Sequence, residues 1–204
     1  MADIIYGLIN RVDASVLEDA IESVFKDFPG ETINYLEVGL YNGRTTSGIK
    51  QYMDGRSIPY NLTGIDNFKD KEDLVFYPKE ANLIQGSSIE VYNQIPDLSQ
   101  HLILIDANHS LPYVIADTMC YKDKVKAGGY LAFHDAAPHS QNKSYQRMGS
   151  ESDPDMYISV LKALEKLGFI GEDNIADHWG FKLIAHKWDE TDEGGGTIIF
   201  RREK

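Results

Sequence analysis

The stretch INYLEVGLYNGRTT, residues 33–46, decides the fold. Its first six residues, INYLEV at 33–38, are typical of a short buried strand, and residues 39–43 are typical of a turn. A helix is expected from Thr45 to Met53. The glycines allow the backbone to approach a ligand closely, and the amino end of the following helix points to the same place. The stretch therefore predicts the first unit of a ligand-binding α/β sheet.

Two common phosphate-binding motifs are absent from this stretch of sequence. Tyr41 stands where the second glycine of G-x-G-x-x-G would fall, and no Gly-Lys-Ser/Thr follows. Glu37 comes just before the first glycine, where it suits an ammonium group better than a pyrophosphate. Asp66 ends the next predicted strand, 62–66, a position from which a carboxylate can bind the two hydroxyls of a ribose. A ligand with a ribose, a positive centre and no pyrophosphate fits both positions.

Strands and helices alternate along the rest of the chain, which predicts a parallel sheet with helices on both faces. The last two predicted strands are joined by the acidic and Gly-rich stretch WDETDEGGG, which favours an antiparallel hairpin. Ser15 and Glu18 indicate a capping box at the start of an N-terminal helix, and the polar residues 136–155 indicate a long loop. The expected strands are 33–38, 62–66, 81–85, 101–106, 129–135, 181–186 and 197–201, and the expected helices are 15–28, 45–53, 89–95, 112–124 and 157–167.

Length and composition indicate one globular domain spanning residues 1–204. The chain has 32 acidic and 20 basic side chains, a net charge of −12, which argues against nucleic acid as a partner because phosphates require clustered Lys and Arg. No apolar run approaches the roughly 18 residues of a membrane span, and the first residues do not resemble a secretory signal. The single cysteine, Cys120, cannot form an internal disulfide. We therefore expect a cytoplasmic protein without a membrane partner.

Several motifs resemble those of class I S-adenosylmethionine-dependent methyltransferases. YLEVGLYNGRTT is similar to their first motif, GID at 64–66 to their second, and QGSS at 85–88 to the turn beside the adenine. LILIDANHS and AGGYLAFHD resemble the fourth and fifth strands of small-molecule O-methyltransferases, most of all the bacterial sugar- and antibiotic-tailoring enzymes, and also the catechol-type enzymes. The resemblance covers about residues 33–135. It implies a Rossmann-like, doubly wound and mostly parallel seven-stranded sheet with a C-terminal antiparallel hairpin.

The resemblance also implies roles for individual residues. A divalent cation, Mg²⁺ or a similar ion, would be held by Asp106, His134 and Asp135, and His109 occupies the place of the general base. His134 replaces an acidic ligand of many relatives, so the alternative is that it supports a ligand without touching the cation. The cofactor-binding residues implied are Glu37, Gly39, Gly43, Asp66, Ser88 and Asp106.

The residues themselves support this chemistry. Asp106 and Asp135 end neighbouring predicted strands, where two like charges are costly unless they share a cation or a proton. His109, three residues beyond Asp106, can take a proton near neutral pH. The alternatives are that strand-end carboxylates cap the following helices, and that His109 is an ordinary capping or surface histidine.

The sequence thus predicts an S-adenosylmethionine-dependent methyltransferase that carries out metal-assisted O-methylation of a small hydroxylated substrate, such as a sugar. One alternative is a metal-independent methyltransferase of the same fold that acts on nitrogen or on a protein. Another is a cofactor-binding module without catalysis. A homodimer is compatible with the resemblance.

Overall fold

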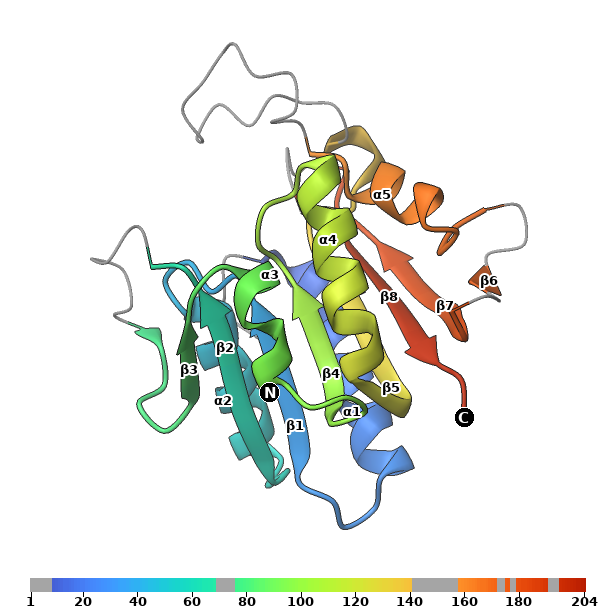
Figure 1. The fold of residues 1–204 in the computed structure, drawn as a ribbon. Helices are drawn as coiled ribbons and strands as arrows, with labels where there is room; N and C mark the ends of the chain where they lie inside the picture. Colours follow the sequence, from blue (N-terminus) through green and yellow to red (C-terminus); the bar gives the residue numbers. More distant parts are fainter. Residues whose placement is uncertain (1–8, 69–75, 141–157, 172–174, 177–178, 191–194) are drawn as a thin grey trace.

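A computed structural model describes residues 9–68, 76–140, 158–171, 175–176, 179–190 and 195–204 (Figure 1). Its centre is a mixed sheet with the strand order β3-β2-β1-β4-β5-β8-β7-β6. The first five strands in the sequence are parallel, whereas β8 lies between β5 and β7 and is antiparallel to both. The strands are β1 (Ile33–Val38), β2 (Tyr60–Asp66), β3 (Asn82–Gln85), β4 (Gln100–Ile105), β5 (Val125–Phe133), β6 (Ile175–Ala176), β7 (Phe181–Lys187) and β8 (Thr197–Arg202).

The predicted fold class is confirmed. Seven strands correspond to the predicted ones, and the two-residue β6 adds a short strand at the edge beside β7. The expected antiparallel hairpin is formed by β7 and β8.

Helices cover both faces of the sheet because successive residues of its central strands are buried on opposite sides. Tyr35 and Leu104 pack with α1 and α2, whereas Leu36 and Ile103 pack with α3, α4 and α5. Figure 1 shows α3 and α4 in front of the sheet and α1 and α2 behind it. The helices are α1 (Arg11–Asp27), α2 (Arg44–Gly55), α3 (Ser88–Val91), α4 (Leu111–Tyr121) and α5 (Val160–Lys166).

The predicted start of the first helix is wrong. Helix α1 begins at Arg11, and its N-cap is Asn10, whose side-chain oxygen accepts a hydrogen bond of 2.9 Å from the Asp13 amide. Ser15 lies inside the helix, where its hydroxyl donates to the Val12 carbonyl at 2.7 Å. Asn is as good an N-cap as Ser, so the earlier cap extends the helix by a turn.

The ends of the other elements differ by a few residues from the prediction. Helix α3 is short and continues as a 3₁₀ turn, Tyr92–Gln94, and α4 is likewise followed by a 3₁₀ turn, Lys122–Lys124. Of the predicted polar loop 136–155, residues 136–140 are described: they contain a 3₁₀ turn, Pro138–Ser140, and the buried Ala136 and Ala137. The remainder of that loop and the predicted start of the helix at 157 lie outside the described residues.

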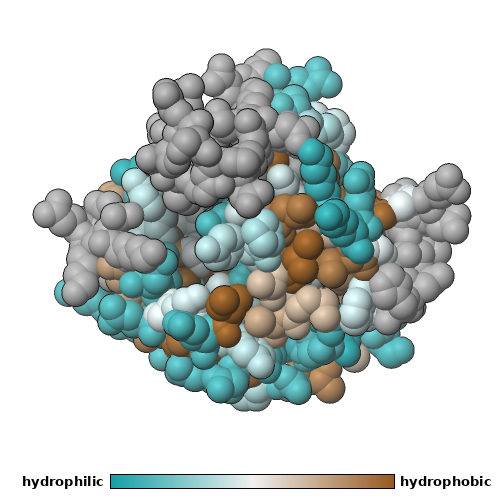
Figure 2. Space-filling model, turned by 45° about the horizontal axis from the view of Figure 1, so that its top comes forward, coloured by the Kyte–Doolittle hydropathy of each residue, from teal (hydrophilic) through white to brown (hydrophobic). Residues whose placement is uncertain are grey.

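Apolar side chains gather on the surface where α3 and α4 lie, with hydrophilic side chains around them (Figure 2). These helices leave Ile89 and Met119 each 42% exposed. Such a surface can pack against another molecule. Among the described helices, none has both the length and the apolar character needed to cross a membrane.

The strand register brings the carboxyl ends of β1, β2, β4 and β5 to one edge of the sheet. Val38 pairs with both Ile65 and Ile105, and Ile105 pairs with Phe133. The residues that end or follow these strands are therefore neighbours, and this edge holds most of the predicted site residues.

Candidate active site

The turn after β1 lies against the loop after β4. Gly39 has a φ of +91°, and a Cβ built on it would lie 2.4 Å from the Asp106 carbonyl oxygen. A residue with a side chain would be strained there and would also clash with backbone. Gly43, with a φ of +78°, is the N-cap of α2. The predicted cofactor loop and the predicted catalytic loop thus form one continuous surface.

Glu37 is a buried carboxyl at the end of β1, with 1% of its surface exposed. Its Oε2 accepts hydrogen bonds from the Thr46 hydroxyl at 2.7 Å and from the Tyr35 hydroxyl at 3.0 Å. Burial, together with the nearby Asp106, outweighs these hydrogen bonds and raises the pKa of Glu37 to about 8. A ligand ammonium group would stabilise the charged form, so this carboxyl fits the amino acid end of S-adenosylmethionine.

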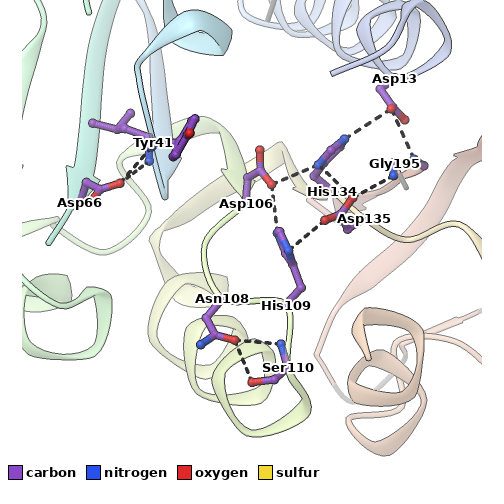
Figure 3. A network of polar contacts seen from close by, with 12 residues as sticks. Asp13, Tyr41, Asp66, Asp106, Asn108, His109, Ser110, His134, Asp135 and Gly195 are labelled. Carbon is purple, nitrogen blue, oxygen red and sulfur yellow. Dashed lines mark hydrogen bonds and ion pairs between the residues drawn. The ribbon is translucent and has the colours of Figure 1, made fainter. Parts of the chain in front are cut away.

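Asp66 holds the turn after β1 in place (Figure 3). Its Oδ2 accepts hydrogen bonds from the amides of Leu40 and Tyr41 at 2.8 and 3.0 Å, and its Oδ1 accepts one from the Phe68 amide at 2.8 Å. Tyr41 has a φ of 48°, the left-handed conformation that a glycine would adopt easily. Besides its predicted ribose contact, Asp66 therefore stabilises a strained turn.

The hydroxyl and the carbonyl of Ser88 face helix α4, not the network of acids and histidines described below. Its hydroxyl donates to Asp117 Oδ1 at 2.5 Å, and its carbonyl accepts a hydrogen bond of 2.8 Å from the Tyr121 hydroxyl. Burial raises the pKa of Asp117 to about 6, although the Ser88 hydrogen bond opposes the shift. The predicted contact of Ser88 with adenine stays a prediction.

His109 bridges two strand ends (Figure 3). Its Nε2 lies 3.1 Å from Asp106 Oδ1, and its Nδ1 lies 2.9 Å from Asp135 Oδ2. Asn108 Oδ1 accepts hydrogen bonds from the amide and the hydroxyl of Ser110, and these bonds turn the chain into α4. His109 lies within this turn, so its side chain points toward the strand ends. The structure thus brings together the predicted base and two predicted carboxylates.

The two carboxylates favour a positively charged His109. Burial by itself would lower the pKa of His109, but Asp135 and Asp106 outweigh it and raise the pKa to about 9. Burial likewise opposes the ionisation of both aspartates, yet the histidines keep the pKa of Asp106 and of Asp135 below the usual range. At neutral pH this cluster is a network of ion pairs.

His134 joins the same network from the end of β5. Its Nδ1 lies 3.1 Å from Asp106 Oδ1 and 3.6 Å from Asp135 Oδ1, and its Nε2 lies 3.4 Å from Asp13 Oδ2. Asp13 is fully buried in the first turn of α1, and Thr197 donates to its Oδ1 at 2.9 Å. Sequence reasoning missed Asp13, because its partners lie more than 100 residues away in the chain. An acidic residue on the buried face of an amphipathic helix was the available signal.

The predicted metal ligands fit a divalent cation in their chemistry. Carboxylate oxygens and an imidazole nitrogen are common ligands of such ions, but here the oxygens of Asp106 and Asp135 lie against His134 Nδ1 itself, at 3.1 and 3.6 Å. Among the described residues, no group of three or more His, Cys, Asp or Glu side chains is arranged to hold a metal ion. The His109 ring stands between Asp106 and Asp135.

The sheet order, together with a match to a methyltransferase family model, identifies the chain as an S-adenosylmethionine-dependent methyltransferase. Residues 36–136 match the family model described as a methyltransferase domain, and they belong to that family. S-adenosylmethionine is the cofactor of this class. A search of curated proteins found no match to the sequence.

Solved structures show the same fold at low sequence identity. Cofactor-bound Rv0187 from MTB aligns with a TM-score of 0.62 and 12% identity over 98% of this chain and 84% of that chain. The N-methyltransferase NodS from Bradyrhizobium japonicum WM9 aligns with a TM-score of 0.56 and 13% identity over 93% and 96% of the two chains. MycE from the mycinamycin biosynthetic pathway, in complex with Mg and SAH, aligns with a TM-score of 0.54 and 14% identity over 88% of this chain and 47% of that chain.

Proposed function

We propose that this chain transfers the methyl group of S-adenosylmethionine to a hydroxyl group of a small molecule, such as a sugar, with the help of a divalent cation. The observation that carries the proposal is the position of His109 between Asp106 and Asp135, because the backbone of Asp106 lies against the turn that contains Gly39. Acid–base groups and the cofactor loop share one edge of the sheet, where methyl donor and acceptor must meet.

The reaction is an in-line displacement in which the acceptor oxygen attacks the methyl carbon and the sulfonium becomes a thioether. The acceptor hydroxyl has to lose its proton, and His109 is the group placed to take it. With Asp135 2.9 Å from Nδ1, we assign the proton transfer to Nε2, the nitrogen that faces Asp106 at 3.1 Å. Asp135 then stabilises the imidazolium that forms, as a carboxylate does behind other histidine bases.

His109 must first be neutral. Its raised pKa keeps it protonated at pH 7 while both carboxylates face it. A divalent cation held by Asp106, Asp135 and His134 would act as a Lewis acid that lowers the pKa of the acceptor hydroxyl, and its charge would offset those of the two carboxylates. Glu37 and Asp66 would bind the amino acid and ribose ends of the cofactor.

The experiment is a methyl-transfer assay with S-adenosylmethionine labelled on its methyl group, against a panel of hydroxylated small molecules, with and without Mg²⁺ and with excess EDTA. Cation-dependent labelling of a hydroxylated acceptor is expected. Calorimetry with S-adenosylhomocysteine on the same preparation tests cofactor binding separately. Well-folded protein that does not bind this ligand in millimolar excess would refute the assignment as an active methyltransferase.

A second candidate is methyl transfer without a metal, on oxygen or nitrogen. The observation that favours it is the position of the His109 ring, whose positive charge already offsets the negative charges of Asp106 and Asp135. Full activity in excess EDTA would select this candidate. Cofactor binding without turnover on any acceptor of the panel would favour a non-catalytic cofactor-binding module.

A further inference from the structure

The turn after β3 lies beside Asp66, the carboxyl proposed to bind the ribose. Asp66 pairs with Gln85 in the parallel register of β2 and β3, and the Gly86 amide donates to the Asp66 carbonyl at 2.9 Å. Ligands of such sheets lie across the carboxyl ends of neighbouring strands. With the amino acid end of the ligand at Glu37 on β1, its base would lie on the other side of Asp66, over the end of β3 and the turn that leads to Ser88.

Helix α4 holds Ser88 by two contacts from successive helical turns. Asp117 Oδ1 accepts a hydrogen bond from the Ser88 hydroxyl at 2.5 Å, and the Tyr121 hydroxyl donates to the Ser88 carbonyl at 2.8 Å. Ser88 is half-buried, whereas Asp117 is 1% exposed. A ligand can therefore reach Ser88 but not Asp117, which acts through Ser88 as a positioning residue.

The contact with Asp117 determines which hydrogen bonds Ser88 can offer to a ligand. A hydroxyl has one proton and two lone pairs, whereas an ionised carboxylate only accepts hydrogen bonds. Burial raises the pKa of Asp117 to about 6, so the carboxyl is mostly ionised at neutral pH. Because the proton of the Ser88 hydroxyl points to Asp117, the hydroxyl oxygen has only lone pairs left for a ligand.

A hydroxyl that can only accept distinguishes between purine bases. Adenine carries an amino group at position 6, which donates hydrogen bonds, whereas hypoxanthine carries an oxygen there, which accepts them. Facing Ser88, the amino group would gain a hydrogen bond, while the oxygen would meet a lone pair. A site built to bind one such group rejects the other because its own polar group is then left unpaired.

We propose that Asp117 fixes the Ser88 hydroxyl as an acceptor for the 6-amino group of adenine, and that this pair makes the chain select adenine over 6-oxopurines at the base of its cofactor. The inference rests on the proposed function, because it concerns the S-adenosylmethionine bound at the same edge of the sheet. It gives a role in recognition to a buried acid of α4 that the methyl transfer itself does not use.

The test compares two ligands that differ at position 6 of the purine. S-adenosylhomocysteine and S-inosylhomocysteine are each titrated into the full chain at pH 7.5 and followed by calorimetry. The wild-type chain is expected to bind the adenine ligand about 10–100-fold more tightly, the effect of leaving one hydrogen-bonding group unpaired. Asp117→Asn should lower that ratio by about 10-fold, because an amide can donate to Ser88 and so free the hydroxyl proton for the 6-oxo group.

Two further variants separate recognition from general damage to the fold. Ser88→Ala removes the acceptor, so it should weaken binding of the adenine ligand without weakening that of the hypoxanthine ligand. Tyr121→Phe is the matched control on α4, because it removes the hydroxyl that holds the Ser88 backbone and keeps the hydrogen bond to Asp117. It should weaken both ligands by the same factor and leave their ratio unchanged.

The inference is overturned if the wild-type chain binds the two ligands equally, if Asp117→Asn keeps the wild-type ratio, or if Tyr121→Phe lowers the ratio as much as Asp117→Asn does. Each of these results still includes binding of S-adenosylhomocysteine, so the proposed function would stand. A well-folded wild-type chain that binds neither ligand in millimolar excess would overturn the inference together with the assignment as an active methyltransferase.

Discussion

Glu37 has opposite effects on folding stability and on ligand binding. Its carboxyl is buried and its pKa is raised to about 8, so an ionised Glu37 destabilises the folded protein without ligand. The same carboxyl is what a buried ammonium group requires. Charged groups at binding sites commonly lower stability in exchange for affinity in this way.

Glu37→Gln should therefore have effects of opposite sign. The amide keeps an oxygen that accepts hydrogen bonds from Tyr35 and Thr46, and it has no charge to bury. We expect a higher melting temperature at pH 8 and weaker binding of S-adenosylhomocysteine by calorimetry. Tighter binding by the variant would contradict the assignment of Glu37 to the amino acid end of the cofactor.

His109→Asn removes the proposed base with little change in volume. We expect turnover to fall about 10²–10⁴-fold, the usual range for a positioned general base. Binding of S-adenosylhomocysteine should change little, because the ring nitrogens of His109 face Asp106 and Asp135, whereas Glu37 and Asp66 are the carboxyls assigned to the amino acid and ribose ends of the cofactor. Wild-type turnover in this variant would assign the base to another group.

The strand-end residues could be predicted, whereas their supporting partners could not. Asp106, His109 and Asp135 follow apolar runs, and the shared edge of a parallel sheet brings such positions together. Asp13 and Gly195 reach the site through tertiary packing: the Gly195 amide donates to Asp135 Oδ1 at 2.9 Å from 60 residues away. No pattern within a short stretch of sequence can predict a contact between residues so far apart in the chain.

The turn between β1 and α2 has a tightly constrained backbone. Gly39 combines a positive φ with backbone atoms of the β4 loop closer than any side chain allows. Gly30 has a similar φ, +81°, but a Cβ there would meet nothing within 4 Å. Comparing substitutions at these two glycines separates the cost of the left-handed conformation from the cost of the close approach.

Gly39→Ala should therefore destabilise the protein more than Gly30→Ala does. The left-handed conformation alone costs a residue with a side chain about 1–2 kcal/mol, and only the Gly39 variant adds a clash. Urea denaturation of both variants gives the comparison. Equal losses of stability would mean that the loops after β1 and β4 do not pack as closely as described.

Asp66 connects β2 to the same turn. Asp66→Ala should weaken binding of S-adenosylhomocysteine by about 1–3 kcal/mol, the usual loss for hydrogen bonds to a charged group. It should also lower the melting temperature without ligand, since Leu40 and Tyr41 lose their acceptor. Calorimetry and thermal unfolding measure the two effects separately, and unchanged binding would argue against the ribose contact.

Element boundaries were predicted less well than element types. The alternation of strands and helices identified the parallel sheet, because apolar runs and amphipathic periods are local properties. The start of α1 was placed too late because two capping signals, Asn10 and Ser15, stand close together, and only the packing of Asp13 against β8 decides between them. Periodicity also could not show that β8 pairs with β5.

For the whole molecule, the buried ionisable groups should give stability a maximum at mildly acidic pH. Glu37 and His109 both have raised pKa values, about 8 and about 9, so the folded chain keeps protons that the unfolded chain releases above about 4.5 and 6.5. Glu37 and His109 together therefore lower the stability of the fold as the pH rises from 4.5 to 9. Asp106 and Asp135, with lowered pKa values, stabilise the fold above pH 4 and lose that effect in acid.

Urea denaturation of the metal-free protein between pH 4 and pH 9.5 tests this expectation. Each raised group should contribute a slope of up to about 1.4 kcal/mol per pH unit within its own window. Glu37→Gln is the control, because it should flatten the profile between pH 4.5 and 6.5 and reduce the slope between 6.5 and 8, where His109 still contributes. Stability that rises from pH 6.5 to 9 would contradict the ion pairs of His109.

The position of β8 in the middle of the sheet has a consequence during protein synthesis. A nascent chain that has left the ribosome only as far as β7 contains Asp106, His109, His134 and Asp135, yet it lacks Gly195 and Thr197, which hold Asp135 and Asp13. Until β8 inserts beside β5, the acids at the sheet edge lack these partners. The chemistry of this chain therefore becomes available only after translation has passed its last strand.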